Sequence, residues 1–141
     1  MFCDTSTLAK YYANEEESGA VRTRLDAGEV TLSELARVEL MSVFHRRFRE
    51  RIWSRAQFLR IVSQFEQDDI KGAWAWLPID GDIIKFSTGV YVRLPDHVFL
   101  RASDCLHIAT AIYSDQSEIY THDDHQAKAA EVLGLAVVRI A

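Results

Sequence analysis

The sequence contains little proline and little glycine: only 2 prolines and 6 glycines occur in 141 residues. No Ser/Gly-rich or Pro-rich stretch divides the chain, and no block of like charge is long enough to form a tail or a linker. Hydrophobic residues make up 48% and aromatic residues 11% of the sequence, which is enough for one hydrophobic core. We therefore expect a single domain over residues 1–141.

Long hydrophobic runs are also missing. Charged residues interrupt every apolar stretch well before the about 20 residues that a membrane span needs, and the first residues lack the basic-then-apolar pattern of a signal peptide. Cys3 and Cys105 lie in apolar runs without C-x-x-C spacing, which favours buried thiols in a reducing compartment over a disulfide or a zinc pair. The sequence predicts a soluble, cytoplasmic protein.

The sequence also lacks an overall basic charge, because its net charge is -5. This value argues against a nucleic-acid partner, because phosphate binding depends on Lys and Arg. The charge is unevenly distributed, however: the segment from Arg37 to Arg60 contains seven arginines and two glutamates. One basic face on an acidic body is therefore expected, and its arginines either contact phosphates or form a solvated helical face.

The hydrophobic pattern predicts strands that alternate with helices. Short apolar segments predict strands at 1–3, 30–32, 76–79, 119–121 and 135–140. Two long helices, with N-caps expected at Ser33 and Ser54, predict a helical hairpin arm. Further helices are expected around 83–90, 105–112 and 126–133, the last closed by Gly134. The fold class is α/β, a three-layer α/β/α arrangement around a mostly parallel sheet of four to five strands.

Four acidic residues occupy positions near the carboxyl ends of the predicted strands, where the functional crevice of an open parallel sheet lies. Asp4 follows the first strand and Asp123 follows the 119–121 strand. Asp104 begins a helix, and Glu39 lies beside the apolar stripe of the helix after the second strand. We expect these four side chains to converge.

Converging carboxylates repel one another and raise one another's pKa unless a cation offsets their charge. Oxygen ligands without a His/Cys set favour Mg²⁺ or Mn²⁺ over zinc. Such an ion can acidify a bound water and stabilise the charge that develops on a phosphate. The pattern indicates phosphodiester hydrolysis.

Each acid also has a structural interpretation. Asp4 and Asp104 could cap helices, Asp123 with Asp124 could form a turn, and Glu39 could be paired in a salt bridge with Arg37 or Arg101. Several other residues invite both kinds of interpretation. His107 is interpreted as a structural residue on a half-buried helix. His122 and His125 are interpreted as exposed loop residues rather than metal ligands. The three tryptophans are expected to pack in the core or in a dimer interface rather than to stack on bases. These tryptophans are Trp53, Trp74 and Trp76.

Four segments, in their order and spacing, resemble the motifs of PIN domains. They are D-T-S-T-L at 4–8, S-E-L-A-R-V-E at 33–39, L-R-A-S-D-C-L-H-I-A at 100–109 and T-H-D at 121–123. The third is the most specific, with Cys105 in place of the alanine usual in the family. The similarity spans residue 4 to about 138 and is greatest to the VapC toxins of VapBC toxin-antitoxin modules.

The resemblance implies a PIN-like fold and an Mg²⁺-dependent endoribonuclease, with Mn²⁺ as a substitute. It implies a homodimer held inactive by a cognate VapB-type antitoxin. Asp4, Glu39, Asp104 and Asp123 match the catalytic and metal-binding acids. The supporting residues are Thr5, Ser6, Thr121 and Asp124, and the arm residues assigned to RNA binding are Arg46, Arg47, Arg49 and Arg51. The choice between Asp123 and Asp124, and the general base, stay open. The alternatives are a PIN-like nuclease for another nucleic acid and an inactive RNA- or protein-binding module.

Overall fold

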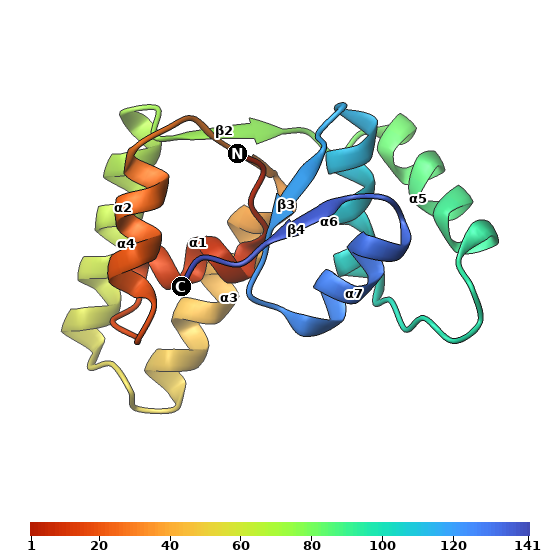
Figure 1. Cartoon of the computed structure of the whole chain (residues 1–141). Helices are drawn as coiled ribbons and strands as arrows, with labels where there is room; N and C mark the ends of the chain where they lie inside the picture. Colours follow the sequence, from red (N-terminus) through yellow and green to blue (C-terminus); the bar gives the residue numbers. More distant parts are fainter.

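The computed structural model describes residues 1–141 and contains two pairs of parallel strands (Figure 1). In the first pair, β1 (Val30–Ser33) lies beside β2 (Trp74–Leu77). In the second, β3 (Glu118–Tyr120) lies beside β4 (Ala136–Val138). Parallel bridges from Phe2 to Thr31 and from Cys3 to Tyr120 connect the two pairs. The N-terminal segment is therefore the centre of the sheet, and the parallel pairing is as the sequence predicted.

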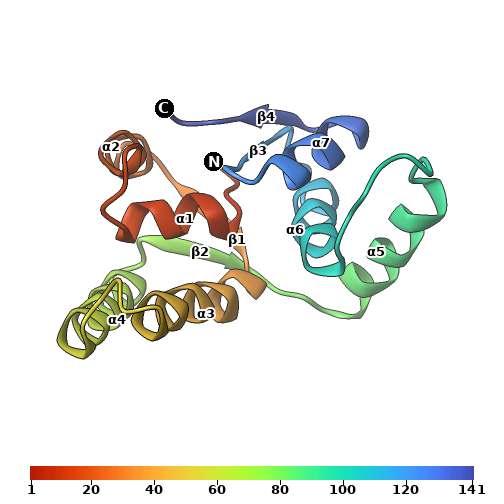
Figure 2. The same cartoon turned by 90° about the horizontal axis from the view of Figure 1, so that it is seen from below.

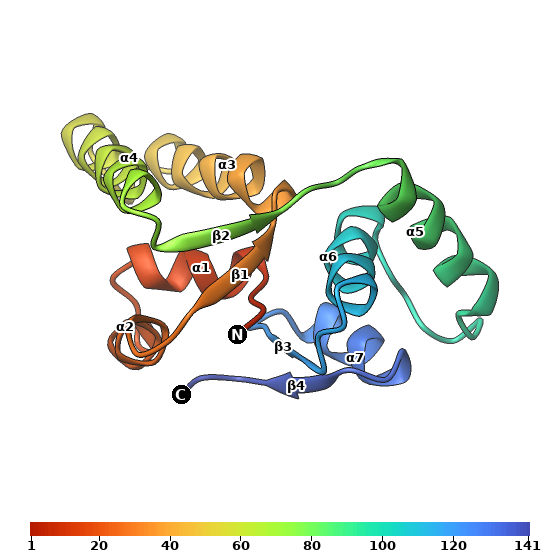
Figure 3. The same cartoon turned by 90° about the horizontal axis from the view of Figure 1, so that it is seen from above.

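Seven helices surround these strands. They are α1 (Thr5–Tyr12), α2 (Ser18–Asp26), α3 (Leu35–Arg49), α4 (Arg55–Ile70), α5 (Gly81–Arg93), α6 (Ala102–Tyr113) and α7 (Asp124–Val132). Figures 2 and 3 show α1 and α2 on one side of β2 and α3 and α4 on the other. The remaining three helices gather at the β3 and β4 end, with α5 packed outside α6. The predicted three-layer α/β/α class is confirmed.

Two hydrophobic clusters form the core, and the N-terminal segment separates them. Successive residues of an extended segment point to opposite faces. Phe2 accordingly packs into the cluster formed with α5, α6, α7 and β3, whereas Cys3 packs into the cluster formed with α1 to α4, β1 and β2. Both side chains are fully buried. This packing on both faces holds the end of the segment, and therefore Asp4, in place.

The helical hairpin arm is formed by α3 and α4, as predicted. Ser54 caps α4 and forms a capping box with Gln57, which satisfies backbone donors at the helix start. Gly134 follows α7 with a φ of 93°, and the backbone N–H of Leu135 donates to the carbonyl of Ala130 at 2.9 Å. This left-handed C-terminal turn was predicted from the glycine. Both cysteines are buried and free, also as expected.

Several predicted boundaries were wrong. Ser33 belongs to β1, and α3 begins after Glu34 without a side-chain cap. β2 begins at Trp74 and ends before Pro78, because proline has no N–H to donate to a neighbouring strand. Helix α2 was not predicted, since only Val21 and Leu25 form its buried apolar contacts. No helix combines the length and the apolar character needed to cross a membrane.

Candidate active site

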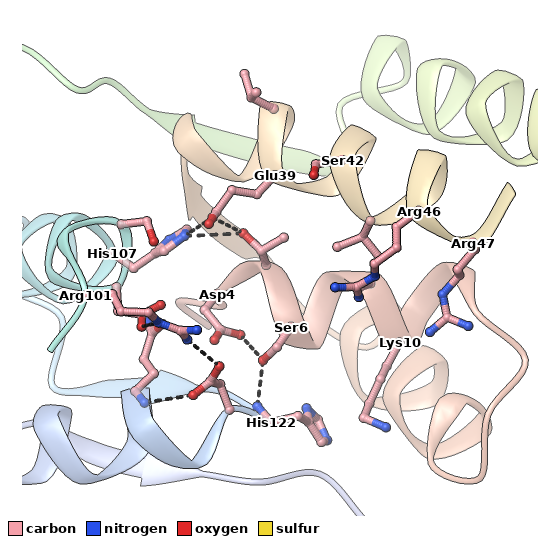
Figure 4. Close-up of a pocket in the computed structure, with 18 of the residues that line it drawn as sticks. Asp4, Ser6, Lys10, Glu39, Ser42, Arg46, Arg47, Arg101, His107 and His122 are labelled. Atoms are coloured by element: carbon pink, nitrogen blue, oxygen red, sulfur yellow. Dashed lines mark hydrogen bonds and ion pairs between the residues drawn. The ribbon is translucent and has the colours of Figure 1, made fainter. Parts of the chain in front are cut away.

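A cavity of about 620 Å³ opens beside the end of the N-terminal segment. Its walls come from α1, α3, the start of α6 and the loop between β3 and α7 (Figure 4). All four predicted acids line it: Asp4, Glu39, Asp104 and Asp123. They come from four separate parts of the sequence, and the fold brings them together at this cavity, as the sequence predicted.

Asp4 is the most enclosed of these acids, with 2% of its surface exposed. Its Oδ1 accepts from the backbone N–H of Thr7 at 3.0 Å and from the Ser6 hydroxyl at 2.7 Å. Its Oδ2 accepts from the Thr121 hydroxyl at 2.5 Å. Asp4 thus caps α1 and also faces the cavity. Burial raises the pKa of Asp4, although these hydrogen bonds counteract it.

Asp123 also has both roles. Its Oδ1 accepts from the backbone N–H of Gln126 at 3.0 Å and caps α7, while its own N–H donates to the Thr121 hydroxyl oxygen at 3.0 Å. Asp124 pairs with Arg139 at 2.7 Å and does not line the cavity. The structure therefore directs Asp123, and not Asp124, into the cavity.

Asp104 lies in the first turn of α6 and is 7% exposed. The helix cap is Arg101, so the interpretation of Asp104 as an N-cap was wrong. Arg101 instead binds two acids at once. Its Nε donates to Oδ2 of Asp104 at 2.7 Å, and its Nη2 donates to Oδ2 of Asp123 at 3.0 Å.

Glu39 contacts Thr5 and His107. The Thr5 hydroxyl donates to Oε1 of Glu39 at 2.6 Å, and Nε2 of His107 forms a close contact with the same oxygen. Burial alone raises the pKa of Glu39, but the hydrogen bonds from His107 and Thr5 outweigh it, so the pKa is lowered overall. The carboxylate is consequently held in its charged form.

The alternative interpretation of Glu39, a salt bridge to Arg37 or Arg101, was wrong. Arg37 pairs with Asp69 at 2.6 Å, and Arg101 pairs with Asp104 and Asp123. His107 was assigned a structural role from the sequence. It is 1% exposed and lines the cavity. Its place three residues after Asp104 puts both on one face of α6, which favours the other interpretation of His107, a role beside the site.

Apart from Arg101, the Lys and Arg residues of the cavity lie toward α1 and the C-terminal part of α3. Figure 4 shows Lys10, Arg46 and Arg47 at this end, away from Glu39 and Arg101. Arg47 pairs with Glu15, as does Lys10 at 3.0 Å. Arg46 forms no salt bridge and is exposed, so it is the uncompensated cation of this end.

The other predicted residues are distributed as follows. Thr5 and Ser6 line the cavity, whereas Arg49 and Arg51 do not. His125 is exposed, as expected, but the side chain of His122 is only 2% exposed. Its ring contacts the Thr7 hydroxyl at 3.1 Å and the carbonyl of Ile140 at 2.8 Å. The tryptophans pack in or against the core, as the structural interpretation predicted, and are Trp53, Trp74 and Trp76.

The chemistry of the four acids suits a divalent cation. They offer only carboxylate oxygens, which hard ions such as Mg²⁺ and Mn²⁺ prefer, and the buried carboxyl of Asp4 has no basic side chain bonded to it. No group of three or more His, Cys, Asp or Glu side chains is already arranged to hold a metal ion. Hydroxyls, His107 and Arg101 hold the carboxylate oxygens instead.

The parallel α/β fold, with acids gathered beside the strand ends, defines the class of the protein. Residues 1–132 match the PIN domain family, and the chain belongs to this family. The resemblance noted in the sequence is thereby confirmed. No curated protein matches the sequence.

Solved structures with the same fold cover nearly the whole chain. FitAcB from Neisseria gonorrhoeae is 18% identical, with 96% of this chain and 94% of that chain covered and a TM-score of 0.72. VapC20 from Mycobacterium tuberculosis, a Sarcin-Ricin loop cleaving toxin, is 17% identical, with 91% and 93% covered and a TM-score of 0.68. A toxin-antitoxin complex from Klebsiella pneumoniae contains a chain that is 18% identical, with 97% and 94% covered and a TM-score of 0.64.

Proposed function

We propose that this PIN domain is a metal-dependent endoribonuclease and the toxin of a type II toxin-antitoxin system. The observation that carries the proposal is the gathering of Asp4, Glu39, Asp104 and Asp123 around one cavity in a chain of this family. Similarity in fold to VapC20, named as a toxin that cleaves the Sarcin-Ricin loop, supports RNA as the substrate.

The four acids are the proposed ligands of Mg²⁺, or of Mn²⁺ in its place. A bound divalent ion acidifies its water and stabilises the negative charge that develops on the phosphate. Thr121 and Ser6 hold Asp4 in orientation, and Thr5 and His107 hold Glu39. Such neighbours fix the direction of carboxylate ligands.

Arg46 is the proposed contact to the RNA backbone. It lies in the same cavity as the acids and its charge is not used by an acidic partner. Arg47 also lines the cavity, but its pairing with Glu15 makes it a weaker contact. Arg49 and Arg51 do not line the cavity, so any contact that they make with RNA lies outside it.

The proposed partners follow from the relatives. One similar structure is a toxin-antitoxin complex, which supports a VapB-type antitoxin as the inhibitor of this chain. Association as a homodimer and action in the cytoplasm belong to the same proposal. An antitoxin bound to the native chain would raise its melting temperature in a concentration-dependent manner.

Cleavage of RNA by the purified protein tests the proposal directly. We expect cleavage with Mg²⁺ or Mn²⁺, none with EDTA, and loss of cleavage in Asp4→Ala and in Asp104→Asn. Asp124→Asn is the matched control, because Asp124 neighbours the site but points away from it, and it should cleave like the wild type. Activity that persists in both site variants would reject the mechanism.

The alternatives are a PIN-like nuclease for another nucleic acid and an inactive RNA- or protein-binding module. A substrate panel of RNA, DNA and small phosphoesters distinguishes the first alternative from the proposed endoribonuclease. The second predicts melting curves that Mn²⁺ leaves unchanged. An ion bound only by the native state at about 100 times its Kd stabilises by roughly 2.7 kcal/mol, which a melting curve detects easily.

A further inference from the structure

The guanidinium of Arg101 lies between two acids of the candidate site. It reaches Asp104 through Nε at 2.7 Å and Asp123 through Nη2 at 3.0 Å. Each bond ends on the Oδ2 oxygen of its carboxylate. One positive group therefore joins two side chains from different elements, the first turn of α6 and the loop before α7.

This bridge balances charge that would otherwise be costly. The side chain of Asp104 is 9% exposed, and two carboxylates brought together without a cation repel each other. Charge-assisted hydrogen bonds from two guanidinium nitrogens offset that repulsion. In the metal-free chain, Arg101 thus does electrostatically what a divalent ion would do at the same two carboxylates.

A guanidinium and a divalent cation on the same two carboxylates repel each other strongly at such short range. We propose that Arg101 is an internal counter-ion that competes with the metal for Asp104 and Asp123 and leaves them when the metal binds. This inference rests on the proposed function, because it takes both acids as metal ligands. Arg101 is then a positioning residue that sets how much free metal the site requires.

The exposure of Arg101 allows this exchange. Its side chain is 50% exposed, so it can turn into solvent without disturbing the core, while the backbone of Arg101 remains the N-cap of α6. Oδ1 of Asp123 stays bonded to the backbone N–H of Gln126, and Asp104 stays in the first turn of α6. Both ligands therefore remain on elements whose backbone does not depend on the arginine side chain.

The chain offers a matched control in Arg139. Its Nη1 pairs with Asp124 at 2.7 Å and its side chain is also 50% exposed. Asp124 directly follows Asp123 in the sequence, yet neither member of this ion pair lines the cavity. An ordinary surface ion pair of this kind has little effect on stability and none on metal binding.

The test measures Mn²⁺ binding to the full-length protein by titration calorimetry and by melting curves. Without metal, Arg101→Gln should melt at a lower temperature than the wild type. It should bind Mn²⁺ roughly tenfold more tightly than the wild type. When saturated with Mn²⁺, it should recover the wild-type melting temperature. Arg101→Lys keeps the charge but loses the double contact, so its affinity should fall between the two. Arg139→Gln should match the wild type throughout.

Equal or weaker Mn²⁺ binding by both Arg101 variants would overturn the inference. The outcome that overturns the proposed function is different. If neither the wild type nor any variant responds to Mn²⁺, the site is no metal site, and both ideas fail. If the wild type responds, Asp104→Asn abolishes the response and Arg101→Gln binds no more tightly, only the competition is refuted.

Discussion

The Thr121 hydroxyl donates to Oδ2 of Asp4 across 2.5 Å and 117 sequence positions. Both residues directly follow the point where the N-terminal segment meets β3, at the parallel bridge from Cys3 to Tyr120. The sheet register thereby determines which hydroxyl meets which carboxylate. The position of the Asp4 carboxylate therefore depends on the neighbouring strand β3 as much as on the helix α1 that it caps.

Thr121→Val should destabilise the protein by about 2 kcal/mol, because it leaves buried polar groups without partners. The groups are Oδ2 of Asp4 and the backbone N–H of Asp123, which uses the same hydroxyl oxygen. Thr121→Ser keeps the hydroxyl and should retain most of the stability. Urea unfolding at neutral pH measures both variants, and equal loss in Val and Ser would show that the hydroxyl is not the cause.

Asp4→Asn should make the metal-free protein less sensitive to pH. Burial raises the pKa of Asp4 above its ordinary value of 3.8. The wild type therefore loses stability as the pH rises from that value through the raised pKa, because it must then bury a charge. Asp4→Asn has no such loss, so it should become increasingly more stable than the wild type over this range.

Thermal melts in EDTA between about pH 4 and pH 8 measure this difference. Saturating Mn²⁺ should reverse the order at pH 8, because only the wild type keeps the ligand. Asp124→Asn serves as the control: because the pKa of Asp124 is lowered by Arg139 from an ordinary value of 3.8, its pH-dependent stability changes fall below this range, and its stability difference should stay nearly constant over it. A constant difference between Asp4→Asn and the wild type would contradict the burial argument.

The gathering of the acids could be predicted because the rule behind it concerns topology. Residues that follow parallel strands meet at one edge of the sheet, so Asp4 and Asp123 could be placed once the strands were recognised. The side chains that bond directly to these acids could not be predicted. Arg101 and Asp104 are three residues apart in the sequence, but the second bond, to Asp123, spans 22 positions and depends on how α6 meets α7.

Glu39 shows the same limit. Its helical position predicted a need for a partner if the carboxylate is buried, and the arginines of the motifs, Arg37 and Arg101, were the partners that the sequence offered. The partner is His107, 68 positions away, because α6 and α3 converge at the cavity. Local signals such as Ser54 and Gly134 were correct, since capping depends on neighbours in the sequence. Side-chain pairing across elements depends on packing that no local pattern contains.

His107→Ala should cost about 3 kcal/mol, because it removes a hydrogen bond to a charged group and leaves a hole in a packed helix face. His107→Gln can place its amide nitrogen near the position of Nε2 and should recover part of the loss. His125→Ala is the control, since His125 is exposed and surface changes stay within about 0.5 kcal/mol. Urea unfolding in EDTA decides whether Ala and Gln differ as expected.

Arg46→Gln should weaken RNA binding more than Arg49→Gln does. The two arginines lie in the last turns of α3, but only Arg46 lines the cavity with the acids. Loss of one phosphate contact should lower the affinity at every RNA sequence alike and reduce the slope of log K against log salt by about 1. Binding is measured with the inactive Asp104→Asn background, so that the RNA stays intact.

The comparison between these two substitutions also separates a specific contact from general attraction. Each substitution removes one positive charge from the same helix, so a long-range field would be weakened equally by both. A contact within the cavity predicts unequal effects, with the Arg49 variant close to the parent protein. If both variants lose the same affinity and the same salt dependence, the arm attracts RNA only through its total charge, and Arg46 has no particular place on the strand.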